Sequence, residues 1–116
     1  MFLKRGFLYS VIFALILLFA LNLSAAVTGK ITGRVIDKQT KEGLPGVNVI
    51  IPELQMGAAT DADGYYFILN VPVGTYTVQA QMITYAPVTM EGVDVSADIT
   101  TTVNFELLPQ AIEVEG

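Results

Sequence analysis

The sequence predicts an all-β fold, a seven-stranded β-sandwich with Greek-key-like connections, preceded by an N-terminal signal helix. Three observations after residue 26 support this fold: Thr and Val are frequent, Gly and Pro interrupt the chain at short intervals, and no stretch repeats its apolar residues with helical spacing. Two segments alternate apolar and polar side chains, so each buries only one face, as two stacked sheets require.

Residues 1–26 are predicted to be a signal peptide. Lys4 and Arg5 form a positively charged start, and Val11–Leu21 is an unbroken apolar run. Small residues follow at positions 24–26, the pattern that signal peptidase needs, and cleavage is expected after Ala26. The alternative is a retained membrane anchor, since the apolar stretch can be extended from Phe7 to Ala26.

Both alternatives place the rest of the chain outside the cytoplasm, in the periplasm, at the outer membrane of a Gram-negative bacterium or secreted. Contact with a membrane is then expected only through the N-terminal segment. The chain has no Cys, which suits an exported domain that folds without disulfides.

Seven strands are expected in the remainder, each ended by a polar turn, Gly or Pro. They are Lys30–Asp37, Val47–Ile51, Gly57–Thr60, Tyr65–Val71, Thr75–Met82, one within Val88–Val95, and Thr100–Leu107. The turns between them are assigned to Pro45, Gly46, Asp63, Gly64, Pro72 and Gly74. Asp63-Gly64 is expected to close a hairpin, because this pair tolerates positive φ angles.

The side-chain pattern of the strands predicts which faces are buried. In the fifth strand Tyr76, Val78, Ala80 and Met82 share one face, and in the seventh Thr101, Val103, Phe105 and Leu107 point inward. The fourth strand is apolar on both faces, so it is either central in its sheet or meets something else with its second face.

Composition excludes most catalytic chemistry. The 116 residues contain no His and no Cys, which removes a Ser-His-Asp triad, a Cys nucleophile and the usual zinc ligands. No catalytic residue, metal site or cofactor is predicted, and the protein is not expected to be an enzyme. After residue 26 the net charge is −7, with four Lys or Arg against eleven Asp or Glu, so nucleic-acid binding is not expected.

Two motifs suggest ligands and have structural alternatives. Asp61-x-Asp63-Gly64 could begin a calcium loop, but Tyr65 and Pro72 stand where an EF-hand needs its third and last ligands, so a turn is expected. A group of aromatic residues is a candidate sugar-stacking platform, with core packing as the alternative. Its members are Tyr65, Tyr66 and Tyr85, together with Phe67 and Tyr76.

Three sequence blocks, taken together, resemble the carboxypeptidase regulatory-like domain, a seven-stranded transthyretin-like (prealbumin-like) sandwich. The blocks are residues 33–40 followed by 44–49, residues 57–66, and residues 70–78. The resemblance covers about Gly29 to Leu108, and the family alignment places Tyr66 and Ile68 inward. One departure is Thr84-Tyr85, where the family usually has Gly-Tyr.

The order of segments also resembles the start of TonB-dependent outer-membrane receptors, in which a signal peptide is followed by this sandwich, a connector, a plug and a β-barrel. Here the expected sandwich spans 27–108, and residues 109–116 resemble an extended acidic connector that is truncated. The resemblance implies a spacer or interaction module in nutrient uptake, with the receptor plug and barrel or the TonB system as partners. The alternative is a stand-alone secreted or periplasmic carbohydrate-binding module.

Overall fold

The computed structural model describes residues 2–21 and 27–111. The first part is one helix, α1 (Phe2–Leu21), which contains Lys4, Arg5 and the apolar run. Within the described ranges, no helix combines the length and the hydropathy that crossing a membrane requires. The predicted cleavage site at Ala26 and the end of the predicted connector lie outside the described residues, so both stay predictions.

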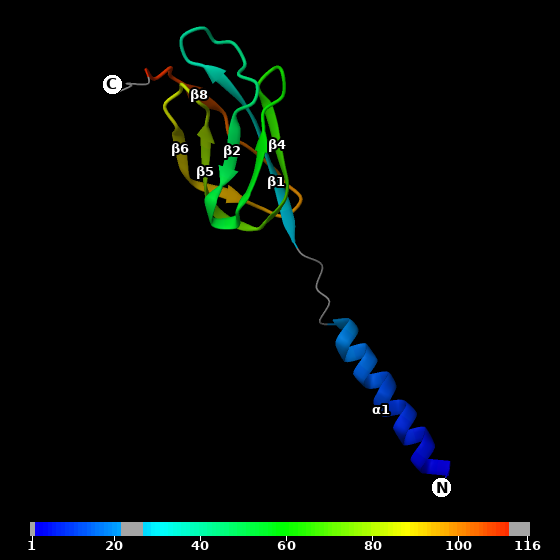
Figure 1. The fold of residues 1–116 in the computed structure, drawn as a ribbon. Helices are drawn as coiled ribbons and strands as arrows, with labels where there is room; N and C mark the ends of the chain where they lie inside the picture. The colour runs from blue at the N-terminus through cyan, green and yellow to red at the C-terminus, as the bar shows by residue number, and fades with distance from the viewer. Residues whose placement is uncertain (1, 22–26, 112–116) are drawn as a thin grey trace.

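Residues 27–111 form two sheets packed face to face, which confirms the predicted β-sandwich (Figure 1). The first sheet contains β1 (Thr28–Asp37), β4 (Tyr65–Pro72), β7 (Thr100–Thr102) and β8 (Phe105–Leu107). The second contains β2 (Asn48–Ile51), β3 (Met56–Ala59), β5 (Gly74–Gln81) and β6 (Val88–Val95), and a short 3-10 helix, η1 (Pro52–Leu54), joins β2 to β3.

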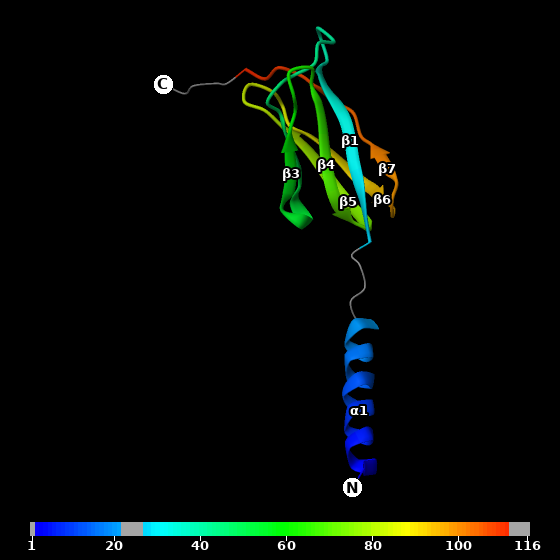
Figure 2. The same cartoon turned by 90° about the vertical axis from the view of Figure 1, so that its right-hand side faces the viewer.

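Strand β1 is the centre of the first sheet, as Figure 2 shows. It pairs antiparallel with β4 on one side and parallel with β7 and then β8 on the other. Its odd-numbered residues are buried and its even-numbered residues face outward, as the period of two in a strand requires. Both the core and the outer surface of this sheet therefore depend on the register of β1.

The core lies between the two sheets and consists almost entirely of aliphatic side chains and two aromatic rings. The rings of Tyr66 and Phe105 meet with centroids 6.4 Å apart at an interplanar angle of 47°. The other members of this buried cluster are Ile31, Val35, Leu44, Val47, Val49, Ile51, Ile68, Val71, Val78, Ala80, Val93, Val95, Val103 and Leu107.

The predicted seventh strand is two strands, β7 and β8, and this corrects the expected count of seven. At the break the side chain of Asn104 replaces a backbone carbonyl: its Oδ1 accepts a hydrogen bond of 2.9 Å from the backbone N–H of Arg34. The N–H of Val103 still donates to the carbonyl of Thr32 at 2.8 Å. The chain thus stays beside β1 while the regular ladder is interrupted.

The break also provides the partner for the largest buried polar side chain. The hydroxyl of Tyr66 donates to the carbonyl oxygen of Val103 at 2.5 Å. Gly33 lies beneath this contact, and a Cβ there would overlap the same carbonyl and the ring of Tyr66. A buried hydroxyl is costly unless it is paired, so this bond allows a tyrosine in an otherwise apolar core.

Asp63-Gly64 does not close a hairpin, which corrects that prediction. The turn connects β3 in the second sheet to β4 in the first, so the two strands that flank it are not paired. Gly64 does adopt a positive φ of 88°. Asp61 holds the turn, because its Oδ1 accepts hydrogen bonds of 2.9 Å from the N–H groups of Asp63 and Tyr65. The chain also changes sheets at Pro72–Gly74, between β4 and β5.

Thr60 links the end of β3 to the segment that leads into β2. It is buried, and its Oγ1 accepts a hydrogen bond of 2.9 Å from the N–H of Val47 while donating one of 2.5 Å to the carbonyl of Leu44. One hydroxyl therefore satisfies two backbone groups around the Pro45-Gly46 turn.

We expect Thr60→Val to lower the free energy of unfolding by about 1–3 kcal/mol, because it leaves a buried N–H and a buried carbonyl unpaired. Thr60→Ser keeps the hydroxyl and is the matched control, with a clearly smaller loss. Urea unfolding followed by far-UV circular dichroism measures both. Equal losses for the two variants would contradict a role for the hydroxyl.

The loop between β5 and β6 contains Thr84, the position at which the resembling family usually has Gly. Thr84 adopts a φ of 73°, the left-handed region that a β-branched residue rarely occupies. Its carbonyl accepts a hydrogen bond of 2.6 Å from the N–H of Gln110, and the N–H of Ala86 donates to Leu108. The loop thus holds the C-terminal residues in place at the cost of backbone strain.

Thr84→Gly is expected to raise the free energy of unfolding by about 0.5–1 kcal/mol, since relief of the left-handed strain outweighs the added freedom of the unfolded chain. Thr84→Ala keeps a Cβ at positive φ and should gain less. Thermal unfolding of the two variants and the natural protein gives the comparison, and a destabilised Thr84→Gly variant would show that the threonine is not strained.

Candidate functional site

The outer face of β4 is an exposed apolar strip of the sandwich. Tyr65, Phe67 and Leu69 alternate along this strand and are 46%, 59% and 56% exposed, while Tyr66 and Ile68 between them are buried. The strand lies at the edge of its sheet, so of the two explanations for its apolar pattern, a central position is wrong. Its second face is exposed and unpartnered within residues 27–111.

The backbone of β4 is open along one side. On β1 the even-numbered residues bond toward β7 and β8, as the N–H of Lys30 does to Ile99 at 3.2 Å, so the odd-numbered residues bond toward β4. The register then pairs Ile68 and Tyr66 with β1, and it shifts by one residue beyond Ile68, where Leu69 and Asn70 lie opposite Lys30. The N–H and C=O groups of Phe67 and Leu69 consequently point away from β1, to the unpaired edge.

Positive charge is concentrated beside this apolar strip. After residue 26 every Lys and Arg lies between residues 30 and 41, and Lys30 and Arg34 project from the outward side of β1. Lys41 forms an ion pair with Glu106 at 3.3 Å, the one salt bridge in the described part of the chain. The outer face of the other sheet is different, because its β5 positions are Thr75, Thr77, Gln79 and Gln81.

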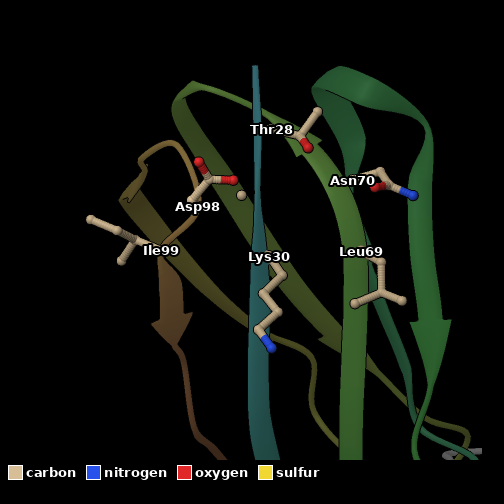
Figure 3. A pocket seen from close by; sticks show the side chains of 7 residues that line it. Thr28, Lys30, Leu69, Asn70, Asp98 and Ile99 are labelled. Carbon is tan, nitrogen blue, oxygen red and sulfur yellow. The ribbon is translucent and has the colours of Figure 1, made fainter. Parts of the chain in front are cut away.

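Lys30 lies at the floor of a hollow of about 290 Å³ near the start of β1. Figure 3 shows its side chain between Leu69 of β4 and Ile99 of the loop before β7. Asn70 and Asp98 stand at the rim with φ angles of 57° and 55°, a conformation that Asn and Asp tolerate better than most residues. The hollow therefore combines one ammonium group and one carboxylate with two apolar walls.

Arg34 occupies a second hollow, of about 420 Å³, farther along the same face. Its guanidinium carbon lies 5.2 Å from the centre of the Tyr65 ring, a cation–π arrangement, and its Nε donates to the carbonyl of Asp63 at 3.0 Å. The guanidinium thus leans from β1 across β4. Ile36 and Glu106 also line this hollow.

The predicted platform of Tyr65, Tyr66 and Tyr85 is not formed. Tyr66 is 1% exposed and belongs to the core, where burial raises the pKa of its hydroxyl. Tyr85 lies in the β5–β6 loop and lines a different hollow, beside Met82 and Ile83. Of these three tyrosines only Tyr65 is on the outer face of β4, so that prediction is wrong for Tyr66 and for the grouping of the three rings.

Tyr85 has a structural partner instead. Its hydroxyl donates to Oδ2 of Asp37 at 2.8 Å, and Oδ1 of the same carboxylate accepts bonds from the N–H groups of Gln39 and Thr40. The Tyr85 bond and then the Thr40 bond hold the pKa of Asp37 below its usual range. The same contact with Asp37 raises the pKa of Tyr85. This network fixes the turn after β1 to the β5–β6 loop.

Neither Asp61 nor Asp63 belongs to a metal-binding group. Among the described residues, no three His, Cys, Asp or Glu side chains come together in a way that could hold a metal ion. The Asp61 carboxylate is engaged with the backbone of its own turn. The turn interpretation of this motif accounts for these contacts.

Comparison with known proteins identifies the fold family. Residues 31–116 match the family model of the CarboxypepD_reg-like domain. The chain belongs to the carboxypeptidase regulatory-like domain family. This agrees with the three sequence blocks, all of which lie within the matched residues.

Two relatives carry the same domain as a small part of much longer chains. The TonB-dependent transporter Oar of Myxococcus xanthus is 33% identical over 93 residues, which are 75% of this chain and 9% of the transporter. Carboxypeptidase D of Anas platyrhynchos is 34% identical over 82 residues, which are 71% of this chain and 6% of that protein. Segments similar to this domain thus occur in proteins with different activities.

Solved structures with this architecture are more distant. A chain in a type II cohesin–X-dockerin complex of Acetivibrio cellulolyticus has a TM-score of 0.60 at 23% identity, covering 72% of this chain and 61% of its own. A candidate carbohydrate binding protein of Bacteroides uniformis has a TM-score of 0.56 at 18% identity, covering 78% and 49%. At this identity the likeness shows the fold alone.

Leu69, Lys30 and Arg34 are surface residues that the sequence did not assign to a site, and Phe67 was assigned only as a member of the aromatic group. The signal for Phe67 and Leu69 was present, because a strand that is apolar on both faces has a second face to cover. No local sequence pattern indicates a role for Lys30 and Arg34. They lie beside the apolar strip only because β1 pairs with β4.

The lowered pKa of Asp37 predicts an acid-dependent contribution to stability. A carboxyl whose pKa is depressed in the folded state stabilises the fold above its ordinary pKa, and this contribution is lost as pH falls through the lower folded value. Tyr85→Phe removes the largest cause of the shift. We therefore expect the variant to lose less free energy of unfolding than the natural protein between about pH 5 and about pH 3.

Tyr76→Phe is the matched control, because the Tyr76 hydroxyl contacts the carbonyl of Val73 rather than a carboxylate. Its pH dependence should equal that of the natural protein. Urea unfolding at a series of pH values measures all three proteins, and parallel curves for natural protein and Tyr85→Phe would contradict the assignment.

Proposed function

We propose that this domain is a non-enzymatic spacer and interaction module of the cell envelope, at the periplasmic N-terminal end of a TonB-dependent outer-membrane transporter. The observation that carries the proposal is the 33% identity to a TonB-dependent transporter across most of the sandwich. The expected signal peptide before the sandwich is consistent with export. The transported ligand would be recognised by other parts of the transporter.

The chemistry of the chain supports a binding role over a catalytic one. The chain contains neither His nor Cys, and each hollow of the outer face holds one cation and one carboxylate, Lys30 with Asp98 and Arg34 with Glu106, rather than a pair of carboxylates or a nucleophile with a base. An exposed apolar strip flanked by cations is typical of an interaction surface.

A second candidate function is carbohydrate binding by a secreted or periplasmic module. Phe67 favours it, because its exposed ring could stack against a sugar, and the fold is shared with a candidate carbohydrate binding protein. Isothermal titration with a panel of neutral and acidic glycans tests it. Heat of binding that disappears in Phe67→Thr would favour this function over the first.

The transporter proposal predicts that the open reading frame continues after Gly116 into a plug and a β-barrel, which the flanking DNA sequence shows directly. In that full-length protein, deletion of residues 27–108 should lower ligand uptake several-fold while the amount of barrel in the outer membrane is unchanged. Exchange for an unrelated sandwich of similar size is the matched control for length. Full uptake after deletion would contradict the proposal.

A further inference from the structure

The open edge of β4 and the cations of β1 together define a surface that an extended peptide would fit. The edge is eight residues long, carries no charged side chain, and presents the backbone groups of Phe67 and Leu69 without a partner strand in the described structure. Natural sheets usually protect such an edge with a charge, a proline or a bulge. Here Pro72 stands only at its end, and the one irregularity is a register shift between Ile68 and Val71, where Leu69 and Asn70 lie opposite Lys30 of β1.

We propose that β4 binds an extended acidic peptide segment as an added strand of the first sheet. Backbone hydrogen bonds to Phe67 and Leu69 would hold the peptide, and side chains on its outward face would contact the apolar strip and the two cations. This deepens the proposed interaction role and rests on it only for the source of the peptide, a protein of the cell envelope.

The spacing of the cations specifies the pattern of the peptide. Lys30 and Arg34 lie four residues apart on the same face of β1, about 13 Å at the rise of a strand. Acidic side chains four residues apart match this distance, and the residue midway between them faces the exposed ring of Phe67, which is level with Thr32 of β1. The pattern is acidic, apolar, acidic at every second position.

Reach across the sheet is consistent with this pattern. An added strand lies about 4.8 Å from β4 and about 10 Å from β1, a gap that a long cation and a Glu side chain bridge between them. The guanidinium of Arg34 already lies over the Tyr65 ring of β4, toward the open edge. Lys30 has no ion pair within the described residues.

Charge and ring geometry favour the peptide over other occupants. A second copy pairing through β4 would bring its own Lys30 and Arg34 to the same face, so cations would lie on both sides of the joint. A sugar would find only the ring of Phe67 open on this strip, since the guanidinium of Arg34 covers one face of Tyr65. The unpaired backbone groups of β4 would be used by an extended peptide. Stacking on a ring or contact with a cation alone would leave them unused.

The test is an NMR titration of the isotopically labelled chain, in the processed form isolated from cells, with synthetic peptides of sequence TETVTET. This sequence places acidic, apolar and acidic side chains on one face and is the same in both chain directions. At peptide concentrations on the order of 1 mM, a range suited to weak binding, we expect shifts of the β4 and β1 amide signals. Peptide TKTVTKT should bind at least tenfold more weakly.

Backbone methylation separates strand addition from other contacts. One TETVTET peptide carries N-methyl groups on the Thr residues at positions 3 and 5, and another on the Glu and Val residues. Because alternate amides of a strand face opposite edges, one of the two should lose binding and the other should keep it. Equal binding by both methylated peptides would overturn the proposal.

Protein variants locate the site. Lys30→Glu should weaken binding of TETVTET about five- to tenfold, and Lys38→Glu, which makes the same change in net charge in the turn after β1, less than twofold. Phe67→Thr should also weaken binding while its thermal melt shows that it folds. Equal effects of Lys30→Glu and Lys38→Glu would show that only net charge matters and would overturn the site.

Three further results would overturn the proposal: no shift with any peptide, a concentration-dependent dimer that forms through β4 without peptide, or shifts at β4 with an acidic polysaccharide but not with TETVTET. Each is independent of the deletion experiment, which measures uptake by the full-length transporter. Loss of uptake on deletion with no peptide binding would therefore retain the proposed function and remove only this binding mode.

Discussion

The register of β1 is the constraint on which the rest of this domain depends. The strand has neighbours on both sides, and a shift by one residue would exchange its buried and outward sets. Its inward residues, such as Ile31 and Val35, lie in the core, and its outward residues include both cations of the candidate surface. The inward and outward alternation along the ten residues of β1 therefore determines both the packing of the core and the charge on the outer face of the first sheet.

The break between β7 and β8 fixes this register. Asn104 bonds to the backbone of Arg34, and the carbonyl of Val103 receives the hydroxyl of Tyr66 from the other neighbour of β1. These polar contacts join both sides of β1 across Gly33, where no side chain would fit. An apolar core tolerates alternative packings, whereas paired buried polar groups have few, so these contacts specify one arrangement.

The two outer faces of the sandwich differ in chemistry, and this difference supports an interaction role. One face carries an exposed apolar strip beside Lys30 and Arg34, and β5 on the other carries Thr and Gln side chains. The domain outside the candidate surface is mainly acidic, which favours solubility and directs negatively charged partners to the cationic face. Family membership explains the fold but not this face, because function depends on sites that differ among members of one fold.

The sequence alone determined the fold class, five strands to within two residues at each end, and the absence of His and Cys chemistry, because alternation, turn residues and composition are local properties. It did not determine that the Asp63-Gly64 turn crosses between sheets or that Asn104 divides the last strand. The pattern of β4 did not show which of its faces is buried, although the family resemblance placed Tyr66 and Ile68 inward, as the structure confirms. Period-two spacing separates two faces without saying which one is covered. That choice depends on which strands pair and stack, so only the tertiary structure decided it.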